Sequence, residues 1–322
     1  MVKMLTIGAA VQDVFLSHSP EFKPVSDKTA DELFIKIEIG SKNDVNNIDF
    51  STGGGATNAA VTFARQGLEA QFMGTIAHDP AGSAVLADLD KEGVDTTFVS
   101  YSEKYCTGYS VVLLSSTGER TFLTYRGAST HYDISNFDLS DVRAEWLYVT
   151  SMAGNVEIVD KIFRQAKSLK TKIFYNPGKD ELKKPSKLKS LLEDVDILSV
   201  NKQEAQLIVD GHDLEELVRK LIHYVPMAII SDGPNGVMAS DGKVIVRAGM
   251  YEDVKVIDRT GSGDAFGSGF LSQWAAGKTL KDSIVFASAN STSVVTKIGA
   301  KSGILHKGVV LHAMPLSEKN FN

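Results

Sequence analysis

Short apolar runs alternate with longer amphipathic stretches along most of the chain. Runs such as 70–77, 145–151 and 195–201 have the length and composition of buried strands. The stretch 156–170 repeats its apolar residues at the spacing of one helix face. Buried strands that alternate with amphipathic helices are typical of a mostly parallel sheet covered by helices on both faces. The pattern therefore predicts an α/β fold.

Several helix ends can be located from the same pattern. Asp79 and Pro80 precede one apolar-periodic stretch and Gly93 follows it, which is the arrangement expected of a capped helix. Near the C-terminus the spacing predicts two more helices, at about 264–276 and 281–296.

Two regions depart from this alternation. Residues 33–50 and 107–126 alternate apolar with polar positions, as strands with one solvated face do. The second region contains a Ser-Ser-Thr-Gly turn at 115–118 and is predicted to be a hairpin. We expect a small sheet beside the main one. No low-complexity linker or internal repeat divides the chain, so we expect a single domain spanning residues 1–322.

Composition excludes some classes of protein. The 322 residues carry a formal net charge of -6, which argues against a nucleic-acid partner. A single cysteine cannot form an internal disulfide, and no apolar run reaches the roughly 18 residues that a membrane helix needs. The first residues are predicted to be a buried strand rather than a cleaved signal. We therefore expect a cytoplasmic protein without a membrane partner.

One glycine-rich segment, Asp258 to Phe270, follows the β-branched run 254–257, which we take as a strand. Backbone N–H groups at Gly261, Ser262 and Gly263 would open a helix near Asp264, and helix starts of this kind bind anions. Asp264 is itself anionic and fits better as a base that takes a proton from an attacking hydroxyl. The alternative is that Asp264 caps the helix and that the glycines only form a turn.

Two other nucleotide-binding patterns are missing. The chain has no Gly-x4-Gly-Lys-Ser/Thr sequence, so it is not a P-loop protein. The dinucleotide fingerprint also fails, because Phe266 stands where a third glycine is required after Gly261 and Gly263. A dinucleotide-dependent oxidoreductase is therefore disfavoured.

The segment Asp258–Phe270 resembles the C-terminal signature of the ribokinase-like, or PfkB, carbohydrate kinases, whose core is Asp-Thr-x-Gly-Ala-Gly-Asp. Here Arg259 replaces the usual Thr and Ser262 the usual Ala. Four further segments resemble motifs of that family in the same order, from the N-terminal signature to the last helix: 53–67, 201–204, 231–236 and 289–300. The resemblance implies a ribokinase-like three-layer fold with a β-sheet lid, and lid strands inserted at about 14–50 and 98–128.

The resemblance also implies phosphoryl transfer from ATP to a hydroxyl group. In that reaction Asp264 would be the base, and Gly261, Ser262 and Gly263 would form the anion hole. Glu204, together with Asn201, would hold Mg²⁺ through water, although an acid in the first helical turn also has a purely structural explanation.

On the acceptor side the family motifs point to four residues. The carboxylate of Asp13 can accept hydroxyl hydrogen bonds, Gly54 and Gly55 would let a sugar approach the backbone, and Asn58 can donate and accept. Asn58 has an alternative role as a cap at the helix start.

On the nucleotide side, Ser231, Gly233 and Gly236 would line the site. Asn290 would face either the adenine or a neighbouring helix. Some members of the family hold a monovalent cation, and a K⁺ site would be formed here by Asp258 with the carbonyl groups of Thr260, Val295 and Gly299.

The acceptor remains open at the level of sequence. A neutral sugar of ribose or fructose type is our first expectation, and a nucleoside or an acidic sugar such as 2-keto-3-deoxygluconate is the alternative. Arg126 would suit a carboxylate or phosphate but is equally explained as a solvated lid residue. Asn176 ends a strand and is a further candidate for substrate contact. The resemblance implies a homodimer through the lid, and a non-catalytic sugar- or nucleotide-binding protein remains an alternative class.

Overall fold

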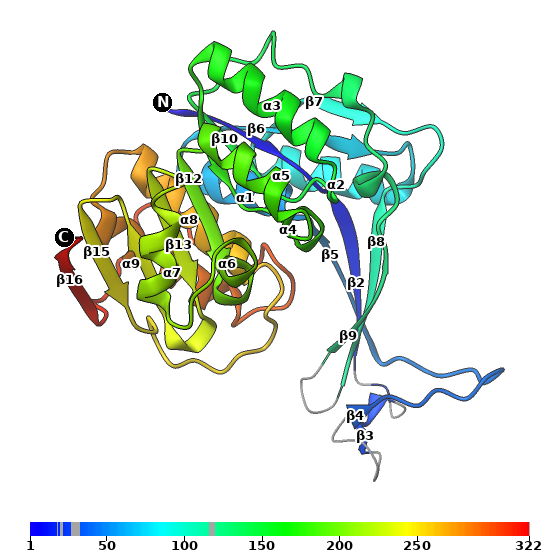
Figure 1. The fold of residues 1–322 in the computed structure, drawn as a ribbon. Helices are drawn as coiled ribbons and strands as arrows, with labels where there is room; N and C mark the ends of the chain where they lie inside the picture. The colour runs from blue at the N-terminus through cyan, green and yellow to red at the C-terminus, as the bar shows by residue number, and fades with distance from the viewer. Residues whose placement is uncertain (18, 20–21, 27–32, 116–119, 322) are drawn as a thin grey trace.

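The computed structural model describes residues 1–17, 19, 22–26, 33–115 and 120–321. Its centre is a ten-stranded sheet, which runs across the main body in Figure 1. Seven neighbouring strands of this sheet pair in parallel, and the remaining three are added at one edge in antiparallel pairing, so the predicted mostly parallel sheet is confirmed. The spatial order is β7 (Asp95–Tyr101), β6 (Glu69–Ile76), β1 (Lys3–Ile7), β10 (Trp146–Val149), β11 (Lys172–Tyr175), β12 (Ile197–Asn201), β13 (Met227–Ser231), β14 (Val237–Ser240), β15 (Val244–Ala248) and β16 (Leu316–Asn320).

Helices cover both faces of this sheet. Side chains alternate between the two faces along each strand, so each face contributes to its own apolar cluster. Leu5 and Ile7 of β1 join one apolar cluster and Met4 joins the other. The first cluster includes residues of α3 (Val156–Leu169), α4 (Lys179–Leu182), α5 (Pro185–Leu191), α6 (Lys202–Ile208) and α7 (Leu214–Leu221). The second includes residues of α1 (Gly55–Arg65), α2 (Pro80–Lys91), α8 (Ser262–Ala275) and α9 (Leu280–Val294).

A second sheet projects from the main body, in the lower right of Figure 1. Its order is β5 (Asn47–Gly53), β2 (Val11–Ser17), β8 (Gly108–Leu114) and β9 (Arg120–Tyr125). A short pair, β3 (Val25–Ser26) and β4 (Leu33–Phe34), lies at its far end. The small sheet predicted from sequence is therefore confirmed. We call it the lid. The predicted hairpin pairs β8 with β9, while turn residues 116–118 lie outside the described part of the chain.

Three expected elements differ in the structure. Residues 98–101, which we placed in the lid, belong to β7 of the main sheet. Residues 35–46 form no strand despite their alternation, and the side chains of Ile37 and Ile39 have little to pack against, since they are 47% and 101% exposed. The run 254–257 is a loop, because no neighbouring strand is there to pair with it.

Short 3₁₀ turns complete the described structure, at Gly127–Thr130, Ile134–Asn136, Leu192–Asp194 and Gly233–Asn235. The predicted cap of α2 is present, since Asp79 accepts the N–H of Gly82 at 2.7 Å. Its other oxygen accepts the N–H of Thr107 at 2.8 Å, which ties this helix to the segment leading into the lid strand β8. No helix among the described residues is both long and apolar enough to cross a membrane.

Candidate active site

Two pockets lie on either side of the N-terminus of α8. The first, of about 280 Å³, is enclosed by the lid, the start of α1, the segment after β10 and residues Thr260, Gly261 and Asp264. The second, of about 140 Å³, lies between α8, α9 and the strands β13 and β14, and includes Ser262 and Gly263. The glycine-rich segment is therefore the wall that the two pockets share. We call them the acceptor pocket and the donor pocket.

Gly261 begins α8 in the left-handed conformation, with φ of 75°. A Cβ atom at this position would lie 2.5 Å from the Cβ of Ala300, so a larger residue does not fit. The N–H of Ser262 contacts the carbonyl of Arg259 at 3.3 Å, whereas Gly263 faces open space. The exposed helix start and the open face of Gly263 suit the approach of an anion.

Asp264 lies three positions inside this helix and does not cap it. Its carboxylate accepts the Nδ2–H of Asn58 at 2.8 Å, across a sequence separation of 206 residues. Burial raises the pKa of Asp264, and the hydrogen bond from Asn58 lowers it in part. The sequence-based alternative of a simple N-cap therefore does not describe this residue, because Gly261 occupies that position.

Asn58 is 3% exposed on α1 and borders the acceptor pocket. Its amide donates to Asp264, while its Oδ1 atom is buried without a hydrogen-bond partner among the described residues. The hydroxyl of Tyr148 is also buried without a hydrogen-bond partner among the described residues, and burial, together with the charge of Asp264, raises its pKa. An acceptor hydroxyl or a water molecule would satisfy such atoms.

The acceptor pocket brings together most of the residues expected on that side. Asp13 lies in β2, is 4% exposed and has its pKa raised by burial, against a hydrogen bond with Ser110. Gly54 has φ of 102°, and a Cβ atom there would lie 2.2 Å from the carbonyl oxygen of Ala9. Gly55 and Arg126 also line the pocket.

Asn176 is not among the residues that line either pocket. Its amide donates to the carbonyl of Ser199 at 2.8 Å and so ties the end of β11 to β12. In the structure this side chain therefore helps to hold two neighbouring strands of the sheet together.

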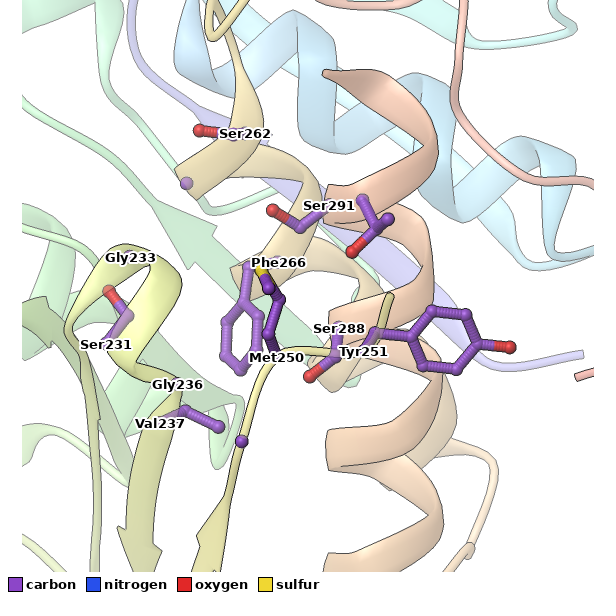
Figure 2. A pocket seen from close by; sticks show the side chains of 13 residues that line it. Ser231, Gly233, Gly236, Val237, Met250, Tyr251, Ser262, Phe266, Ser288 and Ser291 are labelled. Carbon is purple, nitrogen blue, oxygen red and sulfur yellow. The ribbon is translucent and has the colours of Figure 1, made fainter. Parts of the chain in front are cut away.

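The donor pocket contains no charged side chain among the residues that line it. Figure 2 shows Phe266 and Met250 near its centre, with the hydroxyl groups of Ser288 and Ser291 on α9. Ser231 and Gly233 lie at the opposite wall, as the motif predicted. Gly236 has φ of 94°, and a Cβ atom there would lie 2.0 Å from the carbonyl oxygen of Ala248.

Asn290 does not reach this pocket. It is fully buried, donates to the carbonyl of Ala265 at 2.8 Å and accepts the N–H of Leu305 at 2.8 Å. Of the two roles expected from sequence, the structure has the contact with a neighbouring helix.

Glu204 and Asn201 form a reciprocal cap at the start of α6. Each side chain accepts the backbone N–H of the other at 2.9 Å. Burial raises the pKa of Glu204, and nearby Lys179 acts in the opposite direction. Asn201 pairs in register with Ser231, so the cap lies beside the donor pocket. No cluster of three metal-ligating side chains occurs in the described part of the chain.

The residues expected to hold K⁺ converge around Asp258, which is 3% exposed. Its carboxylate accepts the N–H and hydroxyl of Thr260 at 2.9 and 2.7 Å and the N–H of Gly299 at 3.0 Å. It also forms an ion pair with Arg120 of the lid. The carbonyl of Val295 accepts the N–H groups of Ile257 and Asp258.

Two residues of the site were missed from sequence. Glu181 is fully buried, and its carboxylate accepts N–H groups of Met152, Gly154 and Gly178 beside the acceptor pocket. Nothing in its charged local sequence distinguishes it from a solvated acid. Arg120 had a usable signal, because it alternates with Phe122 and Thr124 on one side of β9.

Comparison with known proteins identifies the family. The model of the pfkB family carbohydrate kinases matches residues 25–307. The chain belongs to this family. The expectation of a carbohydrate kinase with a ribokinase-like fold is therefore confirmed.

Individual relatives agree with this family. The chain is similar to a ribokinase of Haemophilus influenzae, at 28% identity over 80% of this chain and 85% of the relative. It is also similar to a fructokinase of Escherichia coli, at 29% identity over 68% and 75% of the two chains. Among solved structures, a putative ribokinase II from E. coli in complex with ATP and Mg²⁺ superposes with a TM-score of 0.78, at 20% identity over 95% of this chain and 96% of the other.

Proposed function

We propose that this PfkB kinase transfers the γ-phosphoryl group of ATP to a hydroxyl group of a sugar of ribose or fructose type. One observation carries the proposal: Asp264 lines one pocket, while Ser262 and Gly263 at the start of the same helix line the next. A base and an anion site on one rigid helix turn are what an in-line transfer between two pockets requires.

In this mechanism Asp264 accepts the proton of the attacking hydroxyl as the oxygen–phosphorus bond forms. Asn58 holds the carboxylate in place and, by donating to it, favours the ionised form that can act as a base. The N–H groups of the segment Gly261–Gly263 stabilise the charge on the transferred phosphoryl group without rearranging. The bond to the leaving ADP oxygen then breaks.

The donor site fits a nucleotide through its backbone and its apolar walls. Gly233 and Gly263 leave the backbone open and Gly236 has no room for a side chain, while Phe266, Met250 and Tyr251 offer surfaces to a base. Mg²⁺, which keeps most of its waters in kinase sites, would be held through water by Glu204 near Asn201. Bound there, it would neutralise charge on the phosphates.

Asp13 defines the acceptor side, because a buried carboxylate accepts two hydroxyl hydrogen bonds from a polyol. The relatives of ribokinase and fructokinase type support a neutral sugar. An acidic sugar is the second candidate, favoured by Arg126, which borders the pocket and has no ion-pair partner among the described residues. A nucleoside is a weaker candidate, with Phe122 as a surface for its base.

We further propose that two copies pair through the lid and act in the cytoplasm. The lid and residues 33–39 beside it expose large apolar side chains, as surfaces that pair with another protein do. They are Leu33, Phe34, Ile37, Ile39, Ile48, Phe50, Phe122, Leu123 and Tyr125. Sedimentation velocity of the wild type and of Leu123→Glu tests this: a monomer in both would contradict pairing through the lid.

The test of the proposed function is ADP release from ATP and Mg²⁺ with a panel of acceptors. The panel contains ribose, fructose, fructose phosphates, 2-keto-3-deoxygluconate, adenosine, cytidine and inosine. We expect one strong acceptor, and a neutral pentose or hexose among the panel. ATP binding without turnover of any acceptor would favour a binding protein over a kinase.

A further inference from the structure

Strand β9 begins with one arginine and is directly followed by another, and only the first has an ion-pair partner among the described residues. Residues 120, 122 and 124 share one side of the strand, and Phe122 and Thr124 line the acceptor pocket together with Arg126. Arg120 lies at the other end of this row, over the ring of Phe122 at 5.6 Å, and pairs with Asp258. The lid thus reaches across the pocket to the main body through this guanidinium.

Asp258 holds the start of the segment Gly261–Gly263, which we call the anion segment, in place through Thr260. One carboxylate oxygen holds the N–H and hydroxyl of Thr260, the residue directly before Gly261, and the other holds the N–H of Gly299. A carboxylate buried to this degree needs a compensating positive charge. Arg120 is its ion-pair partner in the structure, and Asp13, which also interacts with Lys301, is a nearby carboxylate.

The same residues were expected to bind K⁺, and in the structure the Asp258 carboxylate and the Val295 carbonyl already have hydrogen-bond partners. Among the described residues, the Asp258 carboxylate is surrounded by hydrogen-bond donors, including the guanidinium of Arg120. The carbonyl of Val295 already accepts two N–H groups, from Ile257 at 2.8 Å and from Asp258 at 3.2 Å. A monovalent cation at this place would have to displace the arginine.

We propose that Arg120 supplies from the lid the positive charge that a monovalent cation would otherwise bring to Asp258, so that this kinase works without K⁺. Arg120 is then a positioning residue: it acts on the anion segment through Asp258 and Thr260. Because it lies on the lid, closing the lid over the acceptor and balancing the charge beneath the anion hole become one event. The inference rests on the proposed kinase function for its effect on turnover, but not for its effect on cation binding.

The first test therefore measures stability rather than activity. We expect the melting temperature of the wild type to be the same in K⁺ and in tetramethylammonium at equal ionic strength. In Arg120→Gln, K⁺ can bind the vacated carboxylate of the folded state, so K⁺ should raise the melting temperature. Thr121→Ala is the matched control, since this neighbour lies on the opposite side of β9 and should behave like the wild type.

The second test measures turnover with the best acceptor. We expect wild-type turnover to be independent of K⁺, and Arg120→Gln to lose about tenfold or more, as when a preorganised charge near an oxyanion is removed. Added K⁺ or guanidinium should restore part of the loss. Arg120→Lys, which keeps the charge, should remain independent of K⁺ and also serves if the glutamine variant does not fold.

Three results would overturn the inference. These are a wild type that K⁺ stabilises or activates, an Arg120→Gln variant that equals the wild type in both tests, and a loss of turnover that neither cation restores. A wild type that phosphorylates no acceptor would refute the proposed function instead, and the melting experiment would still decide the role of Arg120.

Discussion

The two pockets beside α8 are built from different materials. The donor pocket is lined by glycines, hydroxyls and apolar side chains, without a charged residue, whereas the acceptor pocket carries Asp13, Arg126 and Asp264. A polyphosphate is bound by backbone N–H groups that any sequence with the right glycines provides. A sugar is distinguished by side chains, because only these can match a particular set of hydroxyls or an acid group. We therefore propose that nucleotide binding depends mainly on the backbone and substrate choice on side chains, mostly those of the lid and α1.

The largest effect should come from the one side chain in the acceptor pocket that acts on the reacting hydroxyl. Asp264→Asn keeps the shape of the site but removes the base, so turnover should fall by about two to four decades. ATP affinity, measured by calorimetry, should stay near normal. Asp282→Asn is the control, since it changes an exposed first-turn aspartate of the neighbouring helix. Wild-type turnover in Asp264→Asn would remove this residue from the mechanism.

Asn58 should affect the same carboxylate through its pKa. The base works when ionised, so activity is lost as the pH falls through the pKa of Asp264. Burial raises this pKa and the Asn58 hydrogen bond lowers it, so Asn58→Ala should move the acid limb of kcat/KM to higher pH. The other titratable or charged groups near Asp264 are Asp13 and Arg126, which line the same pocket, and Tyr148, and the variant changes none of them.

Thr57→Ser is the control for Asn58. Thr57 is the neighbouring residue on the same helix, and serine keeps the hydroxyl that donates to the carbonyl of Gly53. Its pH profile should overlay that of the wild type. A lower turnover in Asn58→Ala with an unmoved acid limb would mean that Asn58 only binds the acceptor.

Arg126 tests which acceptor the lid selects. Arg126→Gln should reduce kcat/KM for an anionic acceptor by about tenfold, the scale of one charge-assisted hydrogen bond, and leave a neutral sugar nearly unaffected. Kinetics with fructose and a fructose phosphate separate the two cases. Equal losses for both acceptors would assign Arg126 to lid structure rather than to selectivity.

Much of this arrangement could be predicted from local sequence. The spacing of apolar residues predicts the parallel sheet. The glycine-rich segment predicts the start of α8, where no other residue fits at position 261. Local sequence failed where partners are distant. The pair of Arg120 with Asp258 spans 138 residues, and Asn58 meets Asp264 across 206. For Asn290, local sequence left contact with the adenine and contact with a neighbouring helix both open, because it does not show that both ends of this buried amide are bonded within the protein.

The smallest effect should come from the donor pocket. If backbone and apolar surface do most of the binding there, removing one hydroxyl costs little. Ser288→Ala should raise KM for ATP about threefold, the scale of one neutral hydrogen bond, and leave kcat unchanged. Initial rates over a range of ATP concentrations measure both values. An increase of a hundredfold would contradict the comparison between the pockets, because nucleotide binding would then depend on a side chain as strongly as acceptor choice does.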